Sequence, residues 1–129
     1  MNDFELGWFT GIIEGEGSMF LDTNGARTGR GIIPCIVVAM TDKDTIEQVT
    51  ALAGCGKMYG PYLGKGHIRP IWRWRCRNHD DSLALLQMMR PHLRVRRGQQ
   101  ADKLIKHIET WDRRYAVGSR STLMPNVPA

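Results

Sequence analysis

The chain has 129 residues, of which 24% are charged and 42% hydrophobic, a composition typical of a globular domain large enough for one core. No stretch approaches the roughly 20 apolar residues of a membrane span, and the first residues have no signal-peptide pattern. These features argue against a membrane partner and favour an intracellular location, cytoplasmic or on the nucleoid, with an organelle also open.

The net charge is +5, and most of the 18 basic residues are arginine, the cation best suited to bidentate phosphate and guanine contacts. A genome rich in G and C would produce the same bias without any functional cause. The three cysteines form no close pair, so we expect buried thiols in a reducing compartment rather than a disulfide framework or a zinc site.

The elements are predicted in chain order as follows. Asn2 or Asp3 can cap a first helix that runs to about Glu14. A strand from Gly17 leads through the loop 24–31 to a second strand over 32–40. A capped helix is predicted over 41–54, two strands within 55–77 joined by the turn 64–66, a helix over 79–93 that Pro91 stops, and a last helix over 99–115.

Hairpins that alternate with helices predict an α+β fold, with an antiparallel sheet and helices on one face. The opening pattern of glycines and glutamates occurs once, so there is no sign of an internal duplication. We expect one domain over residues 1–116 and a flexible tail over 117–129, where glycine, serine and two prolines gather.

Residues 68–77, IRPIWRWRCR, alternate between two kinds of side chain. At a period of two, the arginines 69, 73, 75 and 77 share one face, and Trp72, Trp74 and Cys76 share the other. Neighbouring guanidinium groups repel each other, and a polyanion would relieve that repulsion. The alternative is a solvated face with acidic neighbours.

The strand over 32–40 is apolar at both parities, so it is either central and tightly packed or able to read thymine methyls.

Residues 7–20, GWFTGIIEGEGSMF, raise a separate question. Gly7, Gly11 and Gly15 form a stripe without side chains on one helix face, which permits close approach of another backbone. Glu14 and Glu16 lie at the helix C-terminus, where the macrodipole already places about half a negative charge. A positive group is therefore predicted nearby.

The nonapeptide FTGIIEGEG, residues 9–17, resembles the LAGLIDADG motif, and the order of elements resembles that of the single-motif LAGLIDADG homing endonucleases over roughly residues 4–112. The resemblance implies the αββαββα fold, in which a curved four-stranded antiparallel sheet lies on double-stranded DNA. It also implies a homodimer on a near-palindromic site, encoded by a mobile element. The motif helices would meet through Gly7, Trp8, Gly11, Ile12 and Gly15.

The resemblance further implies a metal-dependent site. Glu16 matches the catalytic, metal-binding acid, with the carbonyl of Gly15 and then Glu14 as additional ligands. Hard oxygen ligands favour Mg²⁺; Mn²⁺ should substitute, and Ca²⁺ should support binding without efficient cleavage. Arg96 or Arg97 stands where the family often has an active-site lysine. Asp42 stands where relatives carry a polar group, although it can equally cap the helix that follows it.

The side chains expected to contact DNA lie on the strands and their loops. They are Phe20, Asp22, Asn24, Arg27, Arg30, Lys57, Tyr59, Lys65, Arg69, Arg73, Arg75 and Arg77.

Two other functions stay open at this stage. One is a related nucleic-acid-binding protein that has lost cleavage, such as a transcription regulator or an intron maturase. The other is an enzyme that uses Glu14 and Glu16 as an acid–base pair, as a glycosidase does. Residues two apart on a helix diverge by about 200°, which disfavours that pair within one chain.

Overall fold

The computed structural model describes residues 1–27, 31–66 and 68–111. The expected tail 117–129, Arg30 and the side chain of Arg27 therefore lie outside the described part of the chain. The elements are α1 (Asp3–Glu16), β1 (Gly17–Asp22), α2 (Asn24–Arg27), β2 (Ile33–Met40), α3 (Lys43–Ala53), β3 (Lys57–Tyr62), β4 (Ile71–Cys76), α4 (His79–Met89), the 3₁₀ turn η1 (Arg90–His92) and α5 (Val95–Thr110).

The largest differences from the sequence prediction concern α1, α2 and α5. Helix α1 continues to Glu16 rather than ending near Glu14, and the loop after β1 contains the short helix α2. Helix α5 begins at Val95 instead of residue 99 and ends at Thr110. The N-cap of α5, Arg94, makes no side-chain capping bond, so the local sequence carries no start signal.

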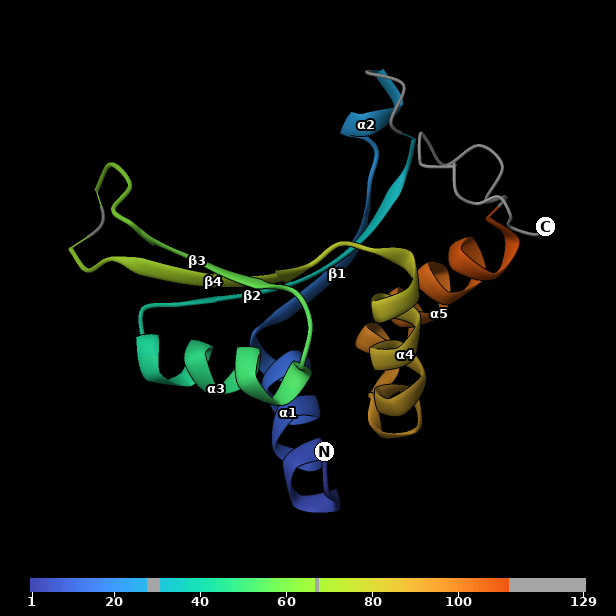
Figure 1. Cartoon of the computed structure of the whole chain (residues 1–129), viewed down its shortest axis with the longest axis horizontal. Helices are drawn as coiled ribbons and strands as arrows, with labels where there is room; N and C mark the ends of the chain where they lie inside the picture. Colours follow the sequence, from blue (N-terminus) through green and yellow to red (C-terminus); the bar gives the residue numbers. More distant parts are fainter. Residues whose placement is uncertain (28–30, 67, 112–129) are drawn as a thin grey trace.

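The four strands form one antiparallel sheet in the order β1-β2-β4-β3. Figure 1 shows α1, α3, α4 and α5 on one side of this sheet, while the β1–β2 and β3–β4 ribbons curve apart toward their tips. The αββαββα arrangement predicted above is confirmed. Strand β2 is central, which explains why it is apolar at both parities.

The core lies between the sheet and these helices. The indole of Trp74 is fully buried at its centre, where it meets the Phe9 ring edge-on with the centroids 5.9 Å apart. The indole N–H of Trp74 donates to the carbonyl of Cys55 over 3.0 Å. Gly56 is required beside it because a Cβ there would lie 2.5 Å from the carbonyl oxygen of Arg75. This packing fixes the register of β4, and so decides which side chains of β4 point away from the helices.

Within the described ranges, no helix is long and apolar enough to cross a membrane. Cys35, Cys55 and Cys76 are all free thiols, with Cys35 and Cys76 buried as predicted and Cys55 half-buried.

Candidate nucleic-acid interface and acidic centre

The outer face of the sheet, away from the helices, carries the basic side chains. Met19, Ile36 and Trp74 are buried toward the helices, and the alternate residues of each strand point to the opposite side. On β4 those alternate residues are Arg73 and Arg75. Across the ladder, Arg75 lies opposite Lys57 and Val37, and Arg73 lies opposite Tyr59 and Ala39.

Aromatic rings of β3 support the arginines of β4. The guanidinium carbon of Arg75 lies 4.6 Å from the ring centroid of Tyr59, and that of Arg73 lies 5.2 Å from the centroid of Tyr62. Such cation–π contacts restrict the guanidinium groups, and Nε of Arg75 is buried with no hydrogen-bond partner among the described residues. We call Lys57, Tyr59, Tyr62, Arg73 and Arg75 the basic ribbon.

Acidic neighbours do not neutralise the basic ribbon. Among the described residues, no carboxylate forms an ion pair with Lys57, Arg73 or Arg75. Lys57 and Arg75 are direct cross-strand partners, an arrangement of like charges that is unfavourable in isolation. The alternative of a solvated face with acidic partners is therefore not supported here, and a polyanionic ligand would relieve the repulsion.

Arg69 and Arg77 were predicted on the same strand face as Arg73 and Arg75, but neither belongs to the basic ribbon. Arg77 donates to Asp22 over 2.8 Å, joining the end of β4 to the end of β1. Neither Asp22 nor Arg77 is thus a free contact group. Arg69 precedes the first residue of β4, so it lies in the exposed β3–β4 connection with Lys65 and not on the strand.

The β1–β2 half of the outer face is neutral by comparison. Ser18 and Phe20 are exposed, with Phe20 at 44%, and Val37 and Ala39 are half-buried. Near the tip, Asn24 is exposed at the start of α2. This half offers small, apolar and aromatic contacts next to the basic ribbon.

The positive groups predicted near the end of α1 come from α5. The carboxylate of Glu14 accepts a hydrogen bond from the backbone N–H of Arg94 over 2.9 Å. The backbone carbonyl of Glu14 also accepts, from Nε of Arg97 over 3.1 Å. The negative end of α1 thus meets the positive end of α5. The carboxylate of Glu14 thus lies at the positive end of α5, and the guanidinium group of Arg97 lies at the negative end of α1.

Glu16 differs from Glu14 in having no such compensation. It is exposed, and its carboxylate makes no hydrogen bond or ion pair with any residue in the described ranges. Gly15, directly before it, is also exposed. Glu16 is therefore the carboxylate at this helix end that is free to bind a cation.

The candidate metal ligands at this helix end are the carboxylate oxygens of Glu16 and the carbonyl oxygen of Gly15, whereas the carboxylate of Glu14 is held by the backbone N–H of Arg94. The described part of the chain contains no group of three or more His, Cys, Asp or Glu side chains that could hold a metal ion. A site with one or two carboxylates suits Mg²⁺, which keeps several waters and takes further ligands from phosphates. The chemistry of these oxygen ligands fits Mg²⁺, provided that further ligands come from outside the chain.

The two candidate arginines of α5 have different surroundings. Arg96 is exposed, whereas Arg97 is only 7% exposed and also donates from Nη1 to Gln100 over 3.0 Å. Gly98, next to Arg97, lies inside α5, and a Cβ there would come within 2.9 Å of the Arg90 guanidinium. Sequence reasoning missed Gln100, for which no motif gave a signal.

Asp42 is the N-cap of α3. Its carboxylate accepts from the hydroxyl of Thr45 over 2.8 Å and from the backbone N–H of Thr45 over 3.4 Å. These bonds, the hydroxyl bond first, lower the pKa of Asp42 from its ordinary value. The structure thus supports the capping interpretation over a polar group of an active site.

The glycine stripe of α1 lies on its open side. Gly7, Gly11 and Gly15 are exposed, and a Cβ built on any of them would meet nothing within 4 Å. Trp8 and Ile12, the other expected interface residues, are half-buried. Packing within the described part of the chain therefore does not explain the stripe.

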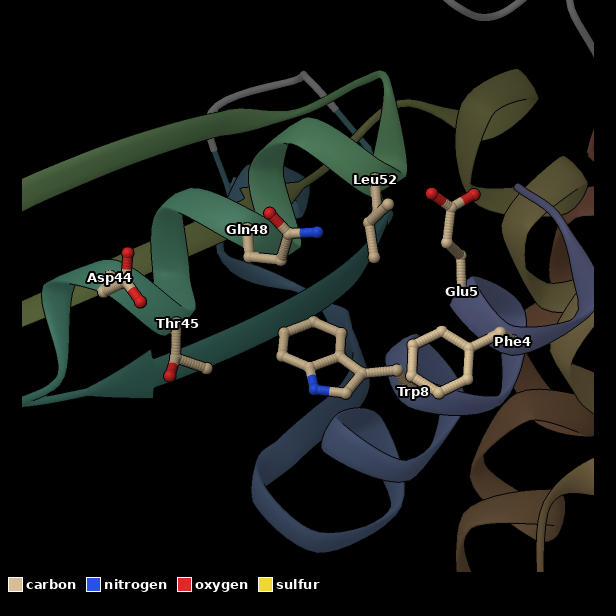
Figure 2. A pocket seen from close by; sticks show the side chains of 7 residues that line it. All are labelled: Phe4, Glu5, Trp8, Asp44, Thr45, Gln48 and Leu52. Carbon is tan, nitrogen blue, oxygen red and sulfur yellow. The ribbon is translucent and has the colours of Figure 1, made fainter.

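Next to the stripe, a groove of about 310 Å³ separates α1 from α3 (Figure 2). It is lined by Phe4, Glu5, Trp8, Asp44, Thr45, Gln48 and Leu52. The Phe4 ring at its edge is 81% exposed. An apolar ring this exposed, beside a bare helix face, is typical of a surface that another molecule covers.

Comparison with solved structures finds this fold in homing endonucleases. The chain superposes on I-CvuI in complex with its target with a TM-score of 0.65 and 13% identity, covering 82% of this chain and 66% of that one. The superposition on I-TnaI has a TM-score of 0.64 and 16% identity, and it covers 81% of this chain and 71% of that one. The superposition on the archaeal intron-encoded I-Vdi141I in complex with DNA has a TM-score of 0.62 and 15% identity, and it covers 93% of this chain and 89% of that one.

Identities this low establish the fold rather than the activity. The chain spans about two thirds of the length of I-CvuI and 37% of that of the LAGLIDADG homing endonuclease I-GzeII. No protein-family model matches the sequence. No curated protein matches it either.

Proposed function

We propose that this chain, which has the fold of the LAGLIDADG homing endonucleases, is a site-specific DNA endonuclease that acts as a homodimer with Mg²⁺. The observation that carries the proposal is the contrast at the end of α1. Glu14 is engaged by α5, whereas Glu16 is exposed and unpaired among the described residues. An unpaired carboxylate at a negative helix end is stabilised by a cation.

DNA binding rests on the outer face of the sheet. The basic ribbon supplies charge for phosphates and guanidinium donors for guanine, and a two-stranded ribbon fits the major groove. The neutral β1–β2 half supplies apolar contacts suited to thymine methyl groups. A half-site read by one chain would therefore combine guanine contacts along β4 with apolar contacts along β1 and β2.

Dimerisation rests on the glycine stripe. Packing two copies of α1 through Gly7, Gly11 and Gly15 would use the open face and bring both Glu16 carboxylates near one axis. A two-fold axis would match a near-palindromic target, with one cut in each strand. It would also supply the carboxylate ligands that a single chain lacks.

Glu16 would hold Mg²⁺ together with the carbonyl of Gly15, and the ion would activate water and neutralise charge on the phosphate. The two carboxylates at the dimer axis would be close enough to repel without it. Arg96, exposed in the first turn of α5, is the side chain free to approach the phosphate. Arginine stays charged and so stabilises negative charge without acting as a base.

The test begins with selection of binding sites from a randomised duplex library in Ca²⁺, followed by exposure of the recovered sites to Mg²⁺. We expect one break in each strand, and a loss of at least about 100-fold in cleavage rate for Glu16→Gln, with binding in Ca²⁺ retained. Glu109→Gln, an exposed carboxylate at the far end of α5, is the matched control. Specific binding without breaks would favour the regulator or maturase function instead.

The dimer is tested with Gly11→Leu, compared with Ala51→Leu on the exposed side of α3. Light scattering at micromolar concentration should show a dimer for the wild type and the control, and a monomer for Gly11→Leu. A wild-type monomer both with and without DNA would contradict the symmetric two-site mechanism.

A further inference from the structure

Arg97 is a buried cation placed against the end of the helix that carries Glu16. Its side chain is 7% exposed, and two of its nitrogen atoms have fixed acceptors. We propose that Arg97 is a positioning residue, which holds the last turn of α1 and thereby orients Glu16. Its effect on cleavage rests on the proposed function, whereas its effect on the order of α1 does not.

The acceptor on α1 is a carbonyl that the helix itself cannot satisfy. In any α-helix the last four carbonyl groups have no partner within the helix. In α1 the carbonyl of Ile13 is satisfied by the N–H of Gly17, the C-cap. The carbonyl of Glu14 is next in the chain, and Nε of Arg97 donates to it. Arg97 thus continues the capping of α1 from a neighbouring helix.

Arg97 is itself held in place. Its Nη1 donates to Oε1 of Gln100, one turn further along α5. Because Nε and Nη1 belong to one planar guanidinium group, fixing both fixes the plane of that group. The bond to Glu14 then has one preferred direction, and the end of α1 has one preferred position relative to α5.

The junction holds Glu14 from two sides. Its carboxylate binds the N–H of Arg94, and its carbonyl binds Arg97. Glu16 follows two residues later and has no such contact with the described residues. The position of Glu16 is therefore set by the backbone that leads to it, and that backbone is anchored at Glu14.

Burial separates the roles of the two neighbouring arginines. A phosphate would have to displace Gln100 or the Glu14 carbonyl to bind Arg97 by the two nitrogens engaged now. Arg96 is exposed on the same helical turn and needs no such displacement. The structure therefore assigns positioning to Arg97 and leaves direct contact with DNA to Arg96.

The first test measures amide hydrogen exchange at residues 15–17 without DNA. Arg97→Met should raise the exchange rate of these amides about tenfold, because the terminal turn of α1 loses a charge-assisted bond. Arg96→Met removes the same charge from the same turn and should leave this exchange unchanged. Lys103→Met, two turns along α5, is a second control for loss of charge.

Cleavage of a selected site provides the second readout. Both Arg97→Met and Arg96→Met should lower the single-turnover rate, yet only Arg97→Met should also change the exchange of residues 15–17. Lys103→Met should change neither. Arg97→Lys retains the charge without the planar fork and should restore cleavage only partly.

Because the Arg97 side chain is buried, Gln100→Leu serves as a milder variant that leaves this arginine in place. It releases Nη1 alone and should raise the exchange of residues 15–17 by a smaller factor. Unchanged exchange in both folded variants would overturn the assignment. If the wild type cleaves no site, the proposed function fails, while the exchange result still decides whether Arg97 holds α1.

Discussion

The two ends of α1 are stabilised in different ways. At the N-terminus, Asn2 accepts from the N–H of Glu5 over 2.8 Å, and the carboxylate of Glu5 accepts from the N–H of Asn2 over 2.9 Å. This reciprocal pair is a capping box, formed within four residues. At the C-terminus, the partners Arg94 and Arg97 are about 80 residues away along the chain.

The residues of α1 balance its macrodipole at the N-terminal end only. The N-terminal end has the charges that the macrodipole favours, with Asp3 and Glu5 in the first turn. The C-terminal end has two carboxylates and no basic residue in its last turn. The sequence of α1 alone would thus destabilise its own C-terminus. A neighbouring helix holds one of these carboxylates, and the second, Glu16, has no partner among the described residues.

The largest expected effect comes from Gly17→Ala at the C-terminal end. An added Cβ would lie 2.7 Å from the carbonyl oxygen and 2.9 Å from the Cα of Ile13, both rigid backbone atoms. We expect a loss of about 2–3 kcal/mol in the free energy of unfolding, measured by denaturant titration. Both variants are made in the Gly11→Leu background, which we expect to be monomeric, and Gly7→Ala, whose Cβ would meet nothing within 4 Å, is the control. A similar loss in both would contradict the steric cause.

Glu14→Ala should have the next largest effect. It removes the acceptor for the N–H of Arg94, so that the first turn of α5 loses its only side-chain cap among the described residues. We expect a loss of about 1–2 kcal/mol. Amide hydrogen exchange should become faster in the first turn of α5. Faster exchange confined to α1 would show that Glu14 does not stabilise the start of α5.

Asn2→Ala tests the local end of α1. Losing the capping box should cost about 1 kcal/mol, with faster exchange in the first turn of α1 and no change in α5. Asn2→Asp retains the cap and is the matched control. If Asn2→Ala altered cleavage as strongly as an Arg97 variant, the two ends would not be independent.

The smallest effect concerns Asp42, another N-cap formed within its own segment. Its hydrogen bonds to Thr45 lower its native pKa below the ordinary 3.8, so its ionised form contributes stability above that value. The contribution is lost as the pH falls through the lowered native pKa. The stability difference between the wild type and Asp42→Asn should therefore be constant above about pH 5 and shrink in stronger acid. A constant difference down to low pH would show that the carboxylate does not titrate in this way.

Features carried by neighbouring residues could be read from the sequence. The alternation of arginine and tryptophan correctly indicated which face of β4 would be buried, because successive strand residues point to opposite sides. The caps at Asn2 and Asp42 could also be predicted, because each cap is formed by residues only three apart in the sequence.

The contacts that complete the site could not be read in this way. Asp22 pairs with Arg77 across 55 positions, and a strand pattern alone left both side chains as free contact groups. The early start of α5 was missed because its capping carboxylate belongs to α1. The supporting positions of Tyr59 and Tyr62 depend on the β3–β4 register, which is irregular between these residues.

By itself, then, the sequence determined the order of elements, the faces of the strands and the charge left at the end of α1, because these follow from backbone periodicity and from side chains within one turn. Only the tertiary structure decided which of the two carboxylates is satisfied and which arginine is buried. That choice depends on the meeting of α1 and α5, whose opposite helix ends attract each other and whose residues are too far apart in the chain for any local pattern to connect them.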